Sequence, residues 1–250
     1  MLRQVWRERM PAPLTLALFA DPVFGAYDER VQMTAAPVRP VPASARSEHT
    51  GPPLLARLPF SRQEANAIAA LVPAAQRKLA LDFAAGRAAV LSEDLTQYRY
   101  LHFATHGRLD NEHPELSALA LSAVDRQGAA QDGFLRTMDV FDLKLNAELV
   151  VLSGCRTALG KEVNGEGLIG LTRGFMYAGA RRVLASLWQV NDAATAELMR
   201  RFYQGLLTAQ PDGKNLTSTA ALRAAQIAMW RDKRWQTPYY WAAFVLQGEW

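Results

Sequence analysis

Residues 149–179 read LVVLSGCRTALGKEVNGEGLIGLTRGFMYAG, and this stretch decides the fold. It opens with four apolar residues, Leu149 to Leu152, a run too short for a helix and too apolar for an edge strand. The run therefore predicts a buried strand. Directly after Ser153-Gly154 comes Cys155, the only cysteine of the chain. A glycine-rich loop follows, and then apolar residues recur at helical spacing. The unit is a strand, a cysteine at its carboxyl end, a loop and a helix.

A second predicted strand ends in a histidine. Residues 98–107 read YRYLHFATHG, an alternating run that closes on His106-Gly107. If the two strands are parallel neighbours, their carboxyl ends lie at one edge of the sheet, and the imidazole and the thiol face each other across a cleft. A lone cysteine at a strand end is more often an inert, buried side chain. The histidine at the neighbouring strand end favours a catalytic role for Cys155 over an inert one.

This pair is sufficient for nucleophilic catalysis. Free cysteine has a pKa of about 8.5, and a nearby imidazole both takes its proton and stabilises the thiolate. His106 would be the base, and later the acid that protonates the leaving amine. Because Gly107 lacks a Cβ, its backbone can approach a reacting carbonyl closely. We expect the N–H groups of Gly107 and Cys155 to bind the oxyanion, a contact worth about 3 kcal/mol per donor.

Several blocks of the sequence carry a family resemblance. In chain order they read HFATHG, LSGCRTALG, GEGLIGLTRGFMYAGA, LASLWQVND and YYWAAFVLQGEW. Together they resemble the CHAT domain, a caspase-like cysteine peptidase domain often attached to tetratricopeptide repeats. The resemblance runs from about Leu14 to Trp250. It implies the caspase-like fold of the group that includes separase and the gingipains, with a His-Cys dyad at His106 and Cys155.

Two acidic residues near this predicted edge have more than one interpretation. Asp192 begins a predicted helix, where it could simply cap the helix. In separase, a tryptophan-containing segment of the same pattern carries an Asp that binds a basic residue before the scissile bond. Carried over, Asp192 implies cleavage after Arg or Lys, because a buried carboxylate can accept a guanidinium. Glu166 is either a favourable charge at a helix start or a cleft residue.

Strands and helices alternate along most of the chain, which predicts an α/β fold with a parallel sheet and right-handed crossovers. Ser61 is expected to cap a helix, with Glu64 as its capping-box partner. Residues 117–135 predict a β-hairpin outside the main sheet. With the resemblance, we expect a caspase-like three-layer sandwich: a mostly parallel sheet of about six strands, helices on both faces and a small β-hairpin.

Composition favours a single domain. The chain has 250 residues, of which 50% are hydrophobic, enough for one good-sized core. We expect an N-terminal flank at 1–13 and a caspase-like CHAT peptidase domain at 14–250, with a Pro-rich surface loop at 25–59. The net charge of +4 is scattered, so a nucleic-acid partner is not expected. With no signal-peptide pattern and no apolar run long enough to span a membrane, we expect a cytoplasmic protein.

The sequence implies no metal and no organic cofactor. A single cysteine excludes an internal disulfide and a cysteine-rich metal site. His102 and His106 lie about 13 Å apart on a strand, so they are not a metal-binding pair. His102 is expected to be a hydrogen-bonded core residue or a neighbour of the dyad.

The function expected is a cysteine endopeptidase acting on a protein or peptide substrate. An activating or repeat-containing partner is possible, and no membrane partner is expected. The alternative is a catalytically silent or latent caspase-like module for interaction or signalling. An ester hydrolase of the α/β type is disfavoured, because no G-x-S-x-G motif occurs.

Overall fold

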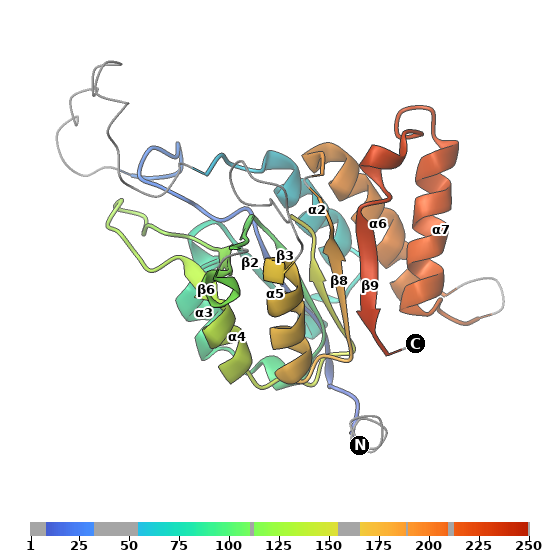
Figure 1. Cartoon of the computed structure of the whole chain (residues 1–250), viewed down its shortest axis with the longest axis horizontal. Coiled ribbons are helices and arrows are strands. Elements are labelled where there is room, and N and C mark those ends of the chain that lie inside the picture. Colours follow the sequence, from blue (N-terminus) through green and yellow to red (C-terminus); the bar gives the residue numbers. More distant parts are fainter. Residues whose placement is uncertain are drawn as a thin grey trace.

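A six-stranded sheet forms the centre of the computed structural model, which describes residues 9–32, 55–110, 113–154, 166–188, 190–209 and 213–249 (Figure 1). The strand order is β2-β1-β3-β7-β8-β9. All neighbours pair in parallel except β8 and β9, which are antiparallel. The mostly parallel α/β sheet is therefore confirmed. The strands are β1 (Leu14–Ala20), β2 (Arg77–Leu81), β3 (Tyr98–Ala104), β7 (Leu149–Leu152), β8 (Arg182–Ser186) and β9 (Phe244–Gly248).

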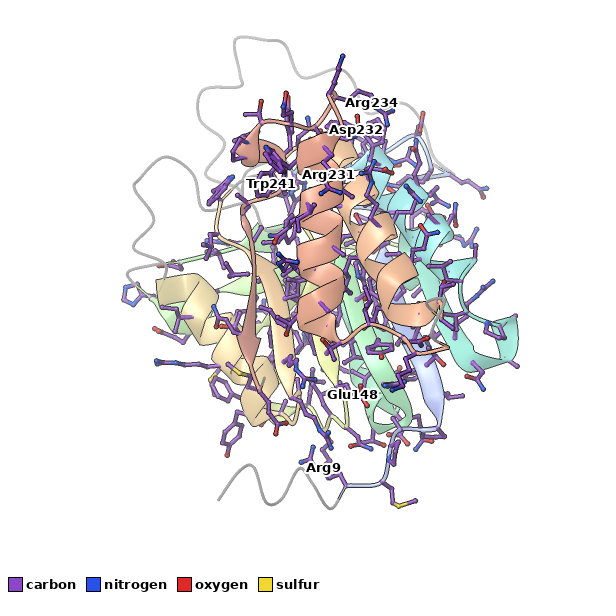
Figure 2. All side chains as sticks on the ribbon, turned by 90° about the vertical axis from the view of Figure 1, so that its right-hand side faces the viewer. Arg9, Glu148, Arg231, Asp232, Arg234 and Trp241 are labelled. Atoms are coloured by element: carbon purple, nitrogen blue, oxygen red, sulfur yellow. The ribbon has the colours of Figure 1, made fainter. Side chains whose placement is uncertain are left out.

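Helices cover both faces of the sheet and form the outer layers of the sandwich. One hydrophobic cluster joins the sheet to α3 (Arg87–Ser92), α4 (Thr137–Asp142) and α5 (Glu166–Tyr177). The other joins it to α2 (Pro59–Ala69), α6 (Asp192–Leu207) and α7 (Ser218–Arg231). Figure 2 shows α6 and α7 lying across their face of the sheet. Short 3-10 helices occur at Ala74–Gln76, Asp82–Ala84, Leu95–Gln97, Pro114–Leu116 and Pro238–Tyr240. Within the described ranges, no helix has the length and apolar composition needed to cross a bilayer.

A small antiparallel sheet lies outside the main one and confirms the predicted hairpin. Its strands are β4 (Gly107–Arg108), β5 (Ala118–Ala120) and β6 (Phe134–Arg136), in that order. The sequence pattern did not predict β4, because two residues are too few to show alternation. β4 follows His106 directly, and the His106 carbonyl accepts from the Ala120 N–H at 2.8 Å. The small sheet therefore anchors the chain directly after the histidine side chain.

The start of α2 differs from the prediction. The helix begins at Pro59, and its N-cap is Leu58, which makes no side-chain capping bond. Proline is favourable at the first helical position because its φ is already helical and it has no N–H to satisfy. Ser61 lies within the first turn, where its hydroxyl donates to the Leu58 carbonyl at 2.6 Å. Glu64 is therefore not a capping-box partner, and its side chain is buried.

Phe103 lies at the centre of one hydrophobic cluster. It is fully buried on β3, and its ring stacks on Phe19 at 5.3 Å and tilts against Phe175 at 5.7 Å. We expect Phe103→Ala to lower the free energy of unfolding by about 3–5 kcal/mol, because apolar area is lost and a cavity remains. Urea unfolding followed by circular dichroism measures the change. Met138, which is exposed on α4, provides the control, and Met138→Ala should stay within about 0.5 kcal/mol. Equal losses in the two variants would contradict this packing.

The aromatic residues near the C-terminal end pack partly against the core. Trp235, Tyr240 and Trp241 are partly buried against the hydrophobic cluster that includes α6 and α7, and they lie just before the last strand. In Figure 2, Trp241 lies at the end of the molecule opposite Glu148, which directly precedes β7. Because β7 runs away from Glu148, Trp241 lies toward the carboxyl ends of the parallel strands.

Candidate active site

Two of the predicted site residues, His106 and Asp192, meet at the carboxyl edge of the parallel sheet. His106 follows β3, Gly154 follows β7, and Asp192 is the first residue of α6 after β8. All three line one cavity of about 50 Å³. Cys155 lies outside the described residues. The cavity is lined by Leu58, Ser61, Glu64, Ala104, His106, Ser153, Gly154, Val190, Asp192 and Thr195.

His106 is held by a backbone carbonyl. The side chain is buried, and Nε2 lies 2.7 Å from the carbonyl oxygen of Ala56. A carbonyl oxygen only accepts, so Nε2 carries the hydrogen, and Nδ1 is the acceptor nitrogen of the neutral ring. The Phe24 ring packs against the imidazole at 5.2 Å. The orientation and the tautomer of the histidine are thus both set. Sequence reasoning missed Ala56, because a contact made by a backbone carbonyl leaves no trace in the side-chain pattern.

An aspartate beside the site holds the segment that carries Ala56. Asp21 follows β1, is fully buried and has a φ of 47°. Arg57 makes two hydrogen bonds to its carboxylate, at 3.0 and 2.9 Å. Arg62 and Arg30 also pair with Asp21, at 2.6 and 3.1 Å. Because Arg57 directly follows Ala56, this pairing fixes the carbonyl that orients His106. No local pattern in the sequence indicated the cluster.

The ends of β3 and β7 approach each other closely at Gly154. A Cβ at this position would lie 2.3 Å from the carbonyl oxygen of Thr105, so a side chain would force the backbone to shift. The Gly107 N–H, predicted to bind an oxyanion, donates to the Gly154 carbonyl at 3.3 Å. This donor therefore has a partner in the structure. It can serve an oxyanion only after that hydrogen bond is given up.

Asp192 is not the cap of its helix. Asn191 is the N-cap, and its side-chain oxygen accepts from the Ala194 N–H. Asp192 instead faces the cavity, and Oδ2 accepts from the Phe60 N–H at 3.0 Å. Burial, with added repulsion from Glu64 and Asp21, raises the pKa of Asp192 to about 6, although the Phe60 hydrogen bond opposes the shift. The group is thus mainly an anion at neutral pH and becomes neutral under mildly acidic conditions.

A buried polar network lies beneath the cavity. His102 Nε2 pairs with Glu64 Oε1 at 2.7 Å, and His102 Nδ1 lies 3.1 Å from the Tyr203 hydroxyl. Ser153 Oγ is 3.3 Å from the same Nε2. Burial and the charge of Glu64 raise the pKa of Tyr203 well above its ordinary value. His102 is thus the hydrogen-bonded core residue that the sequence predicted. Glu64 was missed, since its position in α2 favoured a role in capping.

The other predicted site residue lies at the start of α5. Glu166 is the first residue of that helix, and its side chain lies outside the described residues.

Comparisons with known proteins agree with this fold. The CHAT domain model matches residues 9–249. Tetratricopeptide repeat protein 28 of Mus musculus is 39% identical over 114 residues, which cover 46% of this chain and 4% of that protein. The Homo sapiens protein of that name is 39% identical over 118 residues, which cover 47% of this chain and 4% of that protein. The chain thus spans about 4% of the length of these curated relatives.

A solved structure shares the architecture. It is the crystal structure of the Saccharomyces cerevisiae separase–securin complex, with a TM-score of 0.53 and 12% identity. The match covers 99% of this chain and 13% of that one. At this identity the likeness shows the fold alone, which is the caspase-like architecture expected from the sequence. Because the CHAT domain model matches almost the whole length of this chain, the chain belongs to the CHAT domain family.

Proposed function

We propose that this chain is a cysteine endopeptidase that cleaves after Arg or Lys, with Cys155 as nucleophile and His106 as general base. One observation carries the proposal: a buried histidine, held by the Ala56 carbonyl, shares a cavity with Gly154 and the anionic Asp192. Gly154 directly precedes Cys155 in the chain. A base that is oriented by a third group is the arrangement that activates nucleophiles in hydrolases.

The residues then have defined roles in the reaction. His106 takes the Cys155 proton, and the thiolate attacks the carbonyl carbon of the scissile peptide. The imidazolium returns the proton to the leaving amine, which leaves a thioester on Cys155. Water, deprotonated by His106, hydrolyses the thioester and restores the thiol. The Gly107 and Cys155 N–H groups bind the oxyanion, and Asp192 binds the basic side chain before the scissile bond.

The Gly107 hydrogen bond favours a second candidate function, a latent or silent interaction module. The N–H assigned to the oxyanion donates to Gly154, so the arrangement described is a resting one. A protein partner could release this bond. The similarity to tetratricopeptide repeat proteins supports a repeat-containing partner, and the separase neighbour was solved in complex with securin.

A panel of short fluorogenic peptides ending in Arg, Lys, Asp or Leu separates these functions. Fluorophore release after Arg or Lys supports the peptidase and its specificity. Release only after Asp or Leu would retain the thiol chemistry and overturn the role of Asp192. If no peptide of the panel releases fluorophore, with or without a repeat-containing partner, the peptidase function is overturned and the interaction module is favoured.

Asp192→Asn should abolish the basic preference. The amide keeps the shape of the carboxylate and loses its charge, so kcat/KM for Arg peptides is expected to fall about 100-fold, mainly through KM. Because binding needs the ionised carboxylate, the ratio of kcat/KM for Arg over Leu peptides should rise in the wild type as pH increases through about 6. This dependence should disappear in Asp192→Asn. Asp142→Asn, an exposed change in α4, is the control and should leave the ratio unchanged.

A further inference from the structure

Glu64 lines the cavity that holds Asp192, and one of its carboxylate oxygens has no donor among the described residues. Its side chain is 1% exposed and reaches the cavity from α2. Oε1 accepts from His102, and no described residue donates to Oε2. Asp192 shows the same division, with Oδ2 bound to the Phe60 N–H and Oδ1 without a donor among the described residues. Two carboxylates from different helices thus line a single cavity, and each has one oxygen without a donor among the described residues.

The other polar side chains around the two carboxylates are already engaged. Ser61 donates to the Leu58 carbonyl and accepts from the Asp21 N–H. Thr195 donates to the Asn191 carbonyl at 2.9 Å. Among the described residues that line the cavity, none is an arginine or a lysine. The cavity therefore has acceptors and negative charge to offer, and it matches a ligand rich in N–H donors.

His102 contacts Glu64 from beneath the cavity. Its Nε2 faces a carboxylate oxygen, so Nε2 carries a hydrogen and donates to Glu64. Nδ1 can accept from the Tyr203 hydroxyl, 3.1 Å away. Both ring nitrogens of His102 thus have partners within the buried network. The nearby arginines Arg57 and Arg62 pair with Asp21.

The size of the cavity fits a guanidinium group. At roughly 10–15 Å³ for each water molecule, the volume of about 50 Å³ holds about three to five waters. A guanidinium has one carbon and three nitrogens, and its planar, fork-like donors can reach two carboxylates at once. A lysine ammonium is a single point of charge that would be shared between the two acids.

We propose that Glu64 and Asp192 together form the substrate pocket, and that the two carboxylates select arginine over lysine. The inference rests on the proposed function, which it deepens by naming the substrate class. Glu64 is a specificity residue in this proposal, since it would touch the substrate side chain. Asp192 binds the outer part of the guanidinium beside the Phe60 N–H, and Glu64 binds it from α2.

Cleavage of Arg, Lys and citrulline peptides tests the proposal in wild type and Glu64→Gln. Citrulline keeps the shape of arginine without its charge. In the wild type, kcat/KM should fall in the order Arg, Lys, citrulline. Glu64→Gln keeps an acceptor for His102 and should lower kcat/KM for Arg about 10- to 100-fold through KM, with little change for citrulline. Glu148→Gln is the control. Glu148 precedes β7, at the end of the sheet opposite the cavity (Figure 2), so this change should leave all three kcat/KM values unchanged.

The pH profile separates substrate contact from a structural role. The groups that face Asp192 are Glu64 from α2, Asp21 after β1 and His106 after β3, besides the Phe60 N–H. Removing the negative charge of Glu64 lowers the pKa of Asp192. The rise of the Arg-to-citrulline ratio near pH 6 should therefore move to lower pH in Glu64→Gln. A variant that is merely less stable, with an unmoved pH profile and an unchanged Arg-to-Lys ratio, would overturn the proposal.

Binding to Cys155→Ala keeps this test independent of catalysis. N-acetyl-arginine amide, N-acetyl-lysine amide and N-acetyl-citrulline amide are titrated by calorimetry. Tightest binding of the arginine compound supports the pocket even if no peptide is cleaved, in which case only the peptidase function fails. Cleavage after Arg and Lys at equal rates by the wild type would overturn the role of Glu64 and leave the peptidase standing. That comparison remains decisive if Glu64→Gln does not fold.

Discussion

Replacing Cys155 with alanine is expected to abolish peptide cleavage, with kcat/KM falling by at least about 10⁴-fold. The thiolate forms the bond to the substrate carbonyl, and a methyl group cannot replace it. Loss of a covalent nucleophile removes most of the rate enhancement of such an enzyme, and binding and oxyanion contacts retain only a small part. Fluorophore release from the best Arg or Lys peptide measures the effect.

Two controls give this result its meaning. The thermal unfolding midpoint of Cys155→Ala should stay close to that of the wild type, because the substitution removes only the thiol group and leaves a methyl side chain. Cysteine alkylation of the wild type with iodoacetamide should remove activity in step with the modification of the protein. Since the chain has one cysteine, each modified molecule is modified at Cys155. Cleavage that persists in the alanine variant would assign the reaction to another group.

Replacing His106 with glutamine should lower kcat/KM by about 10²- to 10⁴-fold, the usual contribution of a positioned general base. The amide can still donate a hydrogen bond to the Ala56 carbonyl, so the local backbone keeps its partner. It cannot take a proton from the thiol. Without the imidazole, the thiol should titrate near the ordinary cysteine pKa of about 8.5, and its alkylation at pH 6 should slow markedly. The alkylation rate between pH 5 and pH 9, followed by intact mass, measures this.

The exposed His113 supplies a matched control. Its ring lies 3.4 Å from Glu115 and does not line the cavity. His113→Gln should leave both cleavage and the alkylation profile unchanged. An alkylation profile that is the same in His106→Gln and the wild type would show that the imidazole does not activate the thiol. The proposed dyad would then fail.

Local patterns along the chain were sufficient for the architecture. The strand predicted over Leu149–Leu152 has the same bounds in the structure. Strand 98–104 ends just before His106, as the alternation indicated. These predictions succeed because a buried strand needs a short apolar run and a helix needs apolar residues at its own period, both of which are local properties.

The predictions from sequence are wrong where contacts between residues distant in the chain override the local pattern. Ser61 and Glu64 have the spacing of a capping box, but Pro59 starts α2 one turn earlier in the same region. Aspartate is a common N-cap residue, but Asn191 and not Asp192 is the N-cap of α6. At the start of α6, Asn191 caps the helix and Asp192 is left to face the cavity, whereas the N-cap of α2 makes no side-chain capping bond. Local spacing alone does not decide between such outcomes, because the tertiary fold engages the same side chains elsewhere.

The sequence by itself determined the α/β class, the succession of strands and helices, and the placing of His106 and Asp192 after the strands that bring them to one edge. Only the tertiary structure decided what surrounds them. His106 meets a carbonyl 50 residues away, Asp192 meets an N–H 132 residues away, and Glu64 meets His102 across 38 residues. A strand or helix is encoded by periods of a few residues. A contact between distant backbone groups, or between two buried acids and one cavity, exists only once the chain has folded.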